Sequence, residues 1–296
     1  MIMATAAERR KQRLAVAKTY KIYIDGKFPR TESGRYFSLE DKQGNIIANI
    51  CRGSRKDFRN AVVAARKAQP GWAKASAYLR GQILYRIAEM LEGRRDQFIA
   101  ELSLQGVARR TAEKEVDGSI DRLIYFAGWS DKFQQVFSSV NPVSSSHFNF
   151  SVLEPTGVVS ILAPERSGLI GLISNIAPAI VGGNTCVVLA SESLPLCAVS
   201  FAEVLHAADV PAGVVNILTG HRSELTVHFA SHMDVNAVIY CDGDKKVARL
   251  IQEAAADNIK HVVRRTKTNW PDKTAQHPYL IRDTQEVKTT WHPIGA

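Results

Sequence analysis

The sequence predicts an α/β fold built around a parallel β-sheet. From residue 158 onward, short β-branched runs alternate with longer helical ones, and each predicted strand is almost continuously apolar. Such strands are typical of a sheet covered on both faces, and right-handed crossovers then give a doubly wound, Rossmann-like domain. Any ligand crevice should lie at the carboxyl ends of the strands. The predicted strands are 158–162, 185–189, 214–218, 237–240 and 260–263, and the helices between them begin near Gly168, Leu194, Ser223 and Lys245.

Further helices and a short hairpin are expected before this sheet. The alternating run 20–24 ends at Asp25-Gly26, which predicts a strand followed by a tight turn. Apolar residues spaced three and four apart predict helices, with Arg80 largely off the apolar face of the second. These helical stretches are 58–65, 79–91 and 123–129.

The net charge of +9 is concentrated at the two ends of the chain. Residues 1–19 form a basic tail, and residues 260–296 are basic as well, so the 240 residues between them are close to neutral. A basic groove on the body is therefore not expected, and we predict no nucleic-acid partner. No apolar run approaches the roughly 18 residues that span a bilayer, so we predict no membrane partner and a cytoplasmic location.

Neither the cysteines nor the histidines suggest a reactive centre. The four cysteines show no paired CxxC spacing, and isolated cysteines of this kind are usually reduced and buried. His228 and His232 lie four residues apart, but the intervening residues lack the Glu of a zinc-binding HExxH segment. We therefore predict no metal site and no cysteine nucleophile. The cysteines are Cys51, Cys186, Cys197 and Cys241.

Several segments, in order along the chain, resemble the aldehyde dehydrogenase superfamily. The resemblance starts near Tyr20 and covers nearly the whole chain. It implies an NAD-type domain formed by residues 20–139 and 155–270, and the closest parallel is the degenerate second repeat of double-domain aldehyde dehydrogenases. The segments that carry it are Glu154-Pro-Thr-Gly-Val-Val159, Ile176-Ala-Pro-Ala179, Gly183-Asn-Thr185, Pro211-Ala-Gly-Val-Val-Asn216 and Arg249-Leu-Ile-Gln252.

The positions that carry the family's chemistry differ in this chain. Where the family has a Glu-Leu-Gly-Gly-Lys segment with its general base, the sequence reads Arg265-Thr-Lys-Thr-Asn269. A guanidinium cannot accept a proton near neutral pH. Arg166 stands where the family has an oxyanion-stabilising Asn, and no counterpart of the family's catalytic domain, with its Cys-bearing loop, follows. We therefore expect no catalytic residue.

The resemblance also implies a weakened dinucleotide site. The family's ribose-binding Lys-Pro-Ala-Glu segment aligns with Leu189-Ala-Ser-Glu192, and its pyrophosphate-binding turn aligns with Cys241-Asp-Gly-Asp244. The Asp244 carboxylate would repel a phosphate by roughly 4 kcal/mol at ~4 Å and an effective dielectric of about 20, which corresponds to about three decades of affinity. We expect no cofactor, with any binding of NAD or NADP weakened. The vestigial cofactor residues are Glu192, Gly220 and Gly243.

Residues 140–154 and 279–296 resemble the two halves of the family's oligomerisation arm. The run ending at Trp291 is similar to the family's carboxy-terminal strand, which pairs with the arm hairpin. The sequence thus joins the arm directly to the NAD-type domain, without the catalytic domain between them. Trp291 is a candidate interface residue, since Trp is enriched at binding hot spots.

These observations lead to three hypotheses of function. The first is a non-catalytic subunit that forms a hetero-oligomer with a full-length aldehyde dehydrogenase and stabilises or regulates it. The second is an NAD(P)-dependent aldehyde oxidoreductase whose site is completed from elsewhere. The third is a metabolite or anion sensor that uses the degenerate crevice, with Arg166 and Arg265 as anion ligands.

Overall fold

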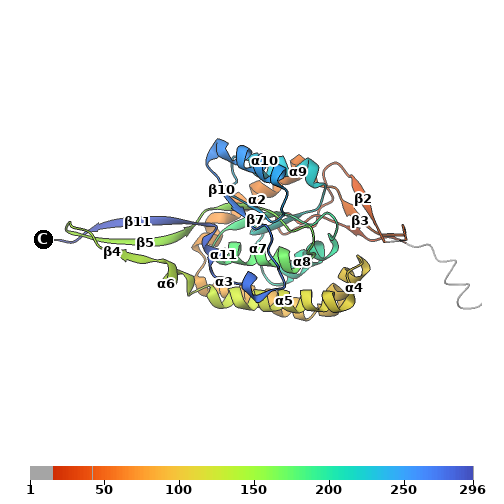
Figure 1. The fold of residues 1–296 in the computed structure, drawn as a ribbon, viewed down its shortest axis with the longest axis horizontal. Coiled ribbons are helices and arrows are strands. Elements are labelled where there is room, and N and C mark those ends of the chain that lie inside the picture. The colour runs from red at the N-terminus through yellow and green to blue at the C-terminus, as the bar shows by residue number, and fades with distance from the viewer. Residues whose placement is uncertain (1–15, 42, 296) are drawn as a thin grey trace, which may run out of the picture.

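The computed structural model describes residues 16–41 and 43–295, and its centre is a five-stranded parallel sheet (Figure 1). The strand order is β10-β9-β6-β7-β8. The predicted sheet and its doubly wound connections are confirmed, although two strands begin one residue later than expected. The strands are β6 (Val158–Leu162), β7 (Thr185–Leu189), β8 (Val215–Leu218), β9 (Ala237–Tyr240) and β10 (His261–Arg264).

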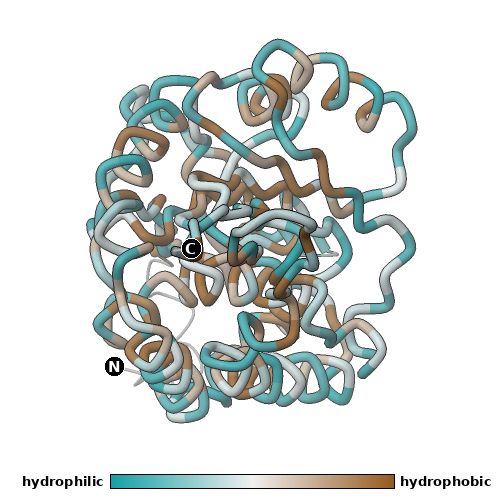
Figure 2. The backbone as a smooth tube through the Cα atoms, turned by 90° about the vertical axis from the view of Figure 1, so that its left-hand side faces the viewer, coloured by the Kyte–Doolittle hydropathy of each residue, from teal (hydrophilic) through white to brown (hydrophobic). Residues whose placement is uncertain are grey.

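Helices cover both faces of this sheet. Alternate residues of each strand point to opposite faces, so Val159 and Ile161 join one apolar core while Val158 and Leu162 join the other. In Figure 2 the hydrophobic segments cross the middle of the molecule and the hydrophilic ones lie around its outside. One face is covered by α3 (Ala77–Glu92), α5 (Arg109–Trp129), α7 (Ile170–Val181) and α8 (Leu196–Ala207), and the other by α2 (Arg55–Lys74), α9 (Arg222–Ser231) and α10 (Lys245–Ala255).

The amino-terminal hairpin is only partly as predicted. A small sheet of order β1-β3-β2 is built from β1 (Thr19–Tyr20), β2 (Tyr36–Glu40) and β3 (Ile46–Cys51). The predicted strand 20–24 does not continue past Tyr20; instead Tyr23 bridges to Ile217 at the edge of the central sheet. The turn is confirmed, with Asp25 and Gly26 both at positive φ. Residues 1–15 of the predicted basic tail 1–19 lie outside the described residues.

Local sequence signals explain where the first helices begin. The Ser54 side chain and the Asp57 carboxylate form a capping box at the start of α2, and Ser76 caps α3. The prediction that Arg80 lies off the buried face of α3 was wrong. Its guanidinium is buried and donates to the carbonyl oxygens of Val181 at 2.9 Å and Ala75 at 2.6 Å, because it satisfies otherwise unpaired helix ends.

A three-stranded antiparallel arm projects from the body, at the left of Figure 1. Its order is β11-β5-β4, and β11 (Gln285–Pro293) pairs with β5 (His147–Pro155) along its whole length. Within the run that resembles the family's carboxy-terminal strand, Tyr279–Arg282 forms the short helix α11, and the strand itself begins at Gln285. The remaining elements are α4 (Arg95–Leu104), α6 (Phe133–Phe137), β4 (Ser139–Asn141) and the 3-10 turns η1 (Ala256–Asn258) and η2 (Lys273–Ala275).

Residues 265–284, called the connector below, link the central sheet to the arm. Two buried guanidinium groups hold it against α5 and α7. Arg122 donates to the carbonyl oxygens of Ala275 at 2.8 Å and Trp270 at 3.0 Å, and Arg265 donates to Asn175 Oδ1 at 2.7 Å and Asp283 Oδ2 at 3.0 Å. Among the described helices, none is long and apolar enough to cross a membrane.

Replacing Arg122 by Met should lower the free energy of unfolding by about 3 kcal/mol. The apolar side chain fills the space but leaves the carbonyl oxygens of Trp270 and Ala275 without their donor, at about 1–3 kcal/mol for each buried group. Urea denaturation measures the loss. The matched control is Arg110→Met, an exposed position on the same helix, which should change stability by no more than about 0.5 kcal/mol. Equal stability of both variants would show that the connector is held by other contacts.

Candidate functional site

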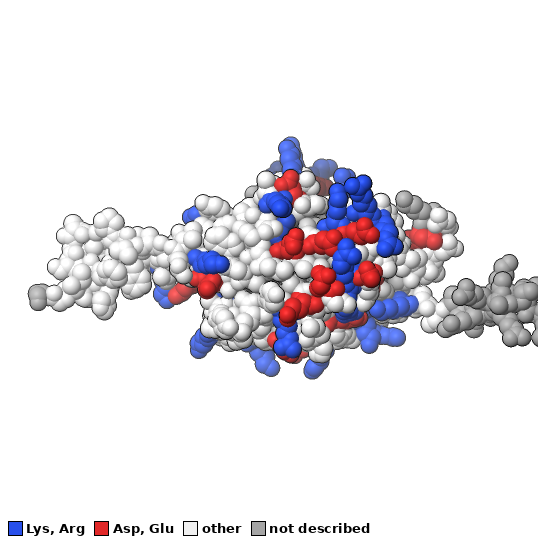
Figure 3. All heavy atoms as spheres, turned by 90° about the horizontal axis from the view of Figure 1, so that it is seen from below, with Lys and Arg blue, Asp and Glu red and all other residues white. Residues whose placement is uncertain are grey.

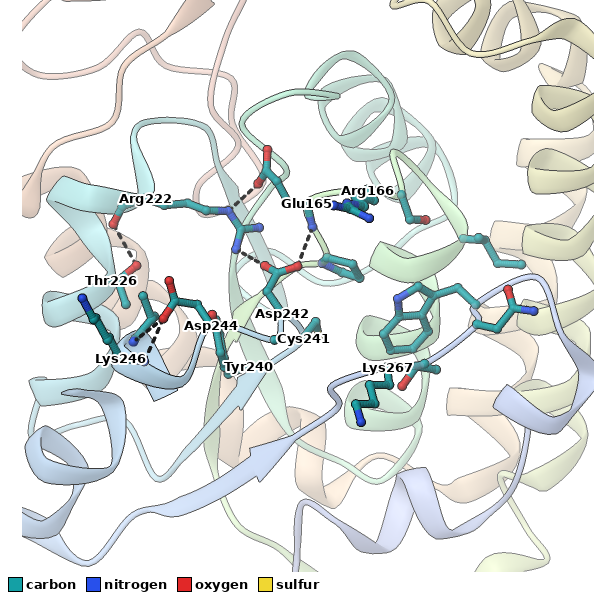
Figure 4. A pocket seen from close by; sticks show the side chains of 18 of the residues that line it. Glu165, Arg166, Arg222, Thr226, Tyr240, Cys241, Asp242, Asp244, Lys246 and Lys267 are labelled. Atoms are coloured by element: carbon teal, nitrogen blue, oxygen red, sulfur yellow. Dashed lines mark hydrogen bonds and ion pairs between the residues drawn. The ribbon is translucent and has the colours of Figure 1, made fainter. Parts of the chain in front are cut away.

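A cleft of about 1290 Å³ opens at the carboxyl ends of β6, β9 and β10. It is the position predicted for a ligand crevice in a doubly wound sheet. The loop after β6 contributes Glu165 and Arg166, the loop after β9 contributes Asp242 and Asp244, and the connector contributes Lys267 (Figure 4). Residues from two separate loops and the connector therefore meet at this edge of the sheet.

Arg222, at the start of α9, ties these loops together. Its Nη1 lies 2.7 Å from Asp242 Oδ2, its Nε lies 2.5 Å from Glu165 Oε2, and it also donates to the carbonyl oxygen of Ala163. Burial raises the pKa of Glu165, but Arg222 and the hydrogen bonds from Ser193 outweigh this and hold it below its usual value. One guanidinium thus pairs with two carboxylates of the cleft, and the three groups together keep one negative charge.

Carboxylates of the chain itself occupy backbone N–H groups around the cleft. Glu115 Oε1 accepts from the Leu169 and Ile170 amides at 2.9 and 3.2 Å, at the start of α7. Asp244 Oδ1 accepts from the Lys246 and Val247 amides at 2.7 and 3.2 Å, at the start of α10. Helix amino termini are ready sites for phosphate because their N–H groups are unpaired. Here those groups already have anionic partners.

The three predicted cofactor residues are not brought together. Gly243 lines the cleft, whereas Glu192 and Gly220 do not. The Glu192 carboxylate lies 2.6 Å from His221 Nδ1 and accepts from the Arg222 amide at 3.0 Å. Gly220 has φ +154°, and a Cβ there would come within 3.1 Å of the Gly53 backbone nitrogen, so close packing already requires glycine. Their role in cofactor binding stays a prediction.

The residues present do not suit a dinucleotide. A pyrophosphate at α10 would have to displace the Asp244 carboxylate from two amides and approach its negative charge. A ribose would have to compete with His221 for Glu192. We therefore derive no chemical step through NAD or NADP in this chain.

Arg265 does not reach the cleft, which corrects its proposed role as an anion ligand. Only 6% of the residue is exposed, and its guanidinium is engaged with Asn175, the carbonyl oxygen of Leu280 and Asp283. Arg166 does line the cleft, and its side chain is exposed there. Of the two arginines, only Arg166 can contact a ligand in this cleft.

The cysteines and histidines give no sign of a reactive or metal centre within the described part of the chain. All four cysteines are buried and free, as expected, and burial raises the pKa of Cys241, which borders the cleft, to about 12. Cys241 is therefore a thiol at neutral pH rather than a thiolate nucleophile. His232 packs edge-on against Phe58, and within residues 16–41 and 43–295 no cluster of three metal-ligating side chains exists.

Sequence reasoning missed the residues that organise the cleft. Glu115, Glu165 and Arg222 come from segments far apart in the chain, and each acts through a partner that only the fold brings near. One signal was present for Asp244: an Asp directly before a predicted helix is a typical N-cap.

Comparison with known proteins shows the family to which this chain is related. The family model "Aldehyde dehydrogenase family" matches residues 29–267, which is well over half of the chain. The chain belongs to the aldehyde dehydrogenase family. The fold agrees, since the NAD+ complex of an aldehyde dehydrogenase from Bacillus cereus aligns with a TM-score of 0.80 at 26% identity over 84% of this chain. The resemblance predicted from sequence is thereby confirmed.

The family relatives are considerably longer than this chain. Aldehyde dehydrogenase 1A1 of Homo sapiens is 33% identical over 249 residues, which are 82% of this chain and 49% of that protein. Cytosolic 10-formyltetrahydrofolate dehydrogenase of Mus musculus is 30% identical over 261 residues, or 86% of this chain and 29% of that protein. The Bacillus cereus enzyme is covered to 51%. The chain thus spans about half the length of most of these aldehyde dehydrogenases.

Calorimetry with 1 mM NAD should give no binding heat, because the helix amides around the cleft already bind carboxylates. Asp244→Ser should strengthen NAD affinity at least tenfold, since it removes the like charge and keeps a side chain able to cap α10. The matched control is Asp272→Ser, which alters a similar capping Asp outside the cleft and should change nothing. Submillimolar binding of NAD by the unaltered chain would contradict this interpretation.

Proposed function

We propose that this chain is a non-catalytic member of the aldehyde dehydrogenase family that assembles with a full-length aldehyde dehydrogenase and stabilises or regulates it. The observation that carries the proposal is the arm, which projects from the body with an open edge and uncovered apolar side chains (Figure 1). A projecting sheet of this kind invites pairing with another chain.

The arm has two chemically different faces. Register places Val140, Phe148 and Phe150 on one face, where Phe148 is 45% exposed and its ring centroid lies 5.5 Å from that of Phe150. The other face carries a ladder of hydrogen bonds that runs from Asn141 through Ser151 to Thr289, and beyond it the exposed Trp291, which stands on this face because its register partner is Asn149. The exposed aromatic side chains support contact with a partner, because neither Phe148 nor Trp291 has cover within the described part of the chain.

The outer half of the arm carries no Lys, Arg, Asp or Glu over 139–152 and 289–296. On the face seen in Figure 3, basic and acidic side chains interleave over the body, whereas the end of the arm shows neither. Exposed edges of monomeric proteins are usually protected by charge. The missing protection supports strand addition along β11, whose other edge pairs with β5.

The partner is proposed to be a full-length family member rather than a second copy of this chain. By the resemblance, the arm of the family extends the sheet of a neighbouring subunit's catalytic domain. Here only the 20 residues 265–284 lie between β10 and β11, so the arm follows the NAD-type domain directly. A complete enzyme would supply the acceptor sheet.

Two features of the NAD-type domain favour this role over aldehyde oxidation by the chain itself. A buried arginine, Arg265, takes the position that the resemblance assigns to the general base, and it bonds to Asn175 and Asp283. Carboxylates occupy the amides of α7 and α10. Both features support assembly without turnover.

Co-expression with the full-length aldehyde dehydrogenase of the same organism should yield a complex that contains both chains, as measured by affinity capture and native mass spectrometry. Trp291→Ala should weaken capture at least tenfold, because an interface Trp typically contributes about 2 kcal/mol or more. Trp291 is 57% exposed on the arm, and the matched control is Tyr78→Ala, an exposed aromatic residue on α3 that should leave capture unchanged.

Two results would overturn the proposal. One is a native mass that shows this chain only as a monomer or homo-oligomer after co-expression. The other is capture that Trp291→Ala and Tyr78→Ala reduce equally, which would place the contact away from the arm.

A further inference from the structure

The cleft suits a ligand that carries hydrogen-bond acceptors better than one that carries hydrogen-bond donors. Its carboxylates are engaged: Glu115 with the α7 amides, Asp244 with the α10 amides, and Glu165 and Asp242 with Arg222. Glu115 and Asp244 each use one oxygen in these bonds, so a ligand that offers hydrogen-bond donors would compete with backbone amides for Glu115 Oε1 and Asp244 Oδ1. The unpaired cations of the cleft meet no such competition.

Three donors lie along one side of the cleft. Arg166 and Lys267 are exposed, and within residues 16–41 and 43–295 neither side chain has a hydrogen-bond or ion-pair partner. Trp270 lines the cleft from a buried position, and within the same residues its indole N–H has no hydrogen-bond partner either. In Figure 4, dashed lines join Glu165, Arg222 and Asp242, whereas none reaches Arg166 or Lys267. These residues are called the donor side below.

The topology sets the spacing of the donor side. Arg166 follows β6 and Lys267 follows β10, and β9 lies between these two strands in the sheet. Neighbouring strands are about 4.8 Å apart, so the two strand ends are separated by about 10 Å. Long side chains can converge on one small group from this distance.

Lys267 is held in an unusual backbone conformation. Its φ is +67°, a left-handed value that costs a residue other than glycine of the order of 1 kcal/mol or more. The connector keeps this conformation because Arg265 and Arg122 anchor it on either side of Lys267 and Trp270. Strain of this kind is common at ligand sites.

The walls of the donor side are apolar. Trp270, Ile170, Pro164 and Pro271 line the cleft beside the donors, and Trp270 is the largest of these side chains. An aromatic wall next to cations suits a flat apolar body that carries a negative group. An inorganic ion would leave this wall in contact with water.

We propose that the donor side, formed by Arg166, Lys267 and Trp270, binds a small organic carboxylate with a flat apolar body. The carboxylate accepts charge-assisted hydrogen bonds from Arg166 and Lys267, and the body packs against Trp270. This site goes beyond the proposed assembly function and needs no partner, no dinucleotide and no chemical step.

The test uses the isolated full chain with 2-naphthoate and its neutral analogue 2-naphthamide, measured by calorimetry. We expect 2-naphthoate to bind at least tenfold more tightly than 2-naphthamide, because only the carboxylate complements the cations. Arg166→Gln should remove this preference. The matched control, Arg264→Gln, changes an exposed arginine on β10 that does not line the cleft and should leave the preference intact.

Each alternative outcome contradicts the proposal. Equal binding of both compounds would show that the negative charge is not recognised. An unchanged preference in Arg166→Gln, in a variant whose thermal unfolding matches that of the unaltered chain, would place the anion elsewhere. Neither of these results bears on capture of a partner by the arm.

Discussion

Two guanidinium groups buried under the connector hold this half-length chain together where the NAD-type domain meets the arm. Burying an arginine is costly unless its donors are matched. Arg122 is 2% exposed and has no carboxylate partner among the residues described; its Nη1 and Nη2 donate to Ser174 and to connector carbonyl oxygens, whereas its buried Nε has no partner there. Burial lowers its pKa, which reflects this cost. If the connector detached from either arginine, that buried guanidinium would lose its hydrogen-bond acceptors.

The path of the connector fixes the positions of the arm and of the donor side. At one end it delivers Gln285, whose side chain donates to the Gly182 carbonyl oxygen, and so fixes the start of β11 against β5. At the other end it places Lys267 and Trp270 beside the cleft. The arm and the donor side are therefore two consequences of one anchored segment, although they are proposed to serve different partners.

Arg265 shows how a position can change its role within a family fold. By resemblance it stands at the general-base position, yet its side chain turns into the protein and bonds to Asn175 and Asp283. A carboxylate at this position would meet the Asp283 carboxylate and not the donors it needs. The arginine thus acts as a structural anchor of the connector, which fits the assembly role proposed above.

Much of the fold could be predicted from the sequence, because buried parallel strands are continuously apolar and the helices between them follow a clear period. The hydrogen-bond partners of buried polar side chains could not be predicted in this way. Helical periodicity predicts that Arg80 lies off the apolar face, because it does not reveal the carbonyl oxygens of Val181 and Ala75 that accept hydrogen bonds from this buried side chain. Glu115 caps a helix that begins more than 50 residues later, a contact that no local pattern indicates. The four-residue helix α11 is too short for a periodic signal.

We propose that the open edge of β11 pairs with a strand of a full-length aldehyde dehydrogenase. Hydrogen exchange of the backbone amides of Gln285–Pro293, measured in the isolated chain and after addition of that enzyme, examines this pairing itself. Amides of β11 that exchange rapidly in the isolated chain should become protected in the complex, while those of the surface helix α10 should not change. Unchanged exchange along β11 in a sample that contains both proteins would contradict it.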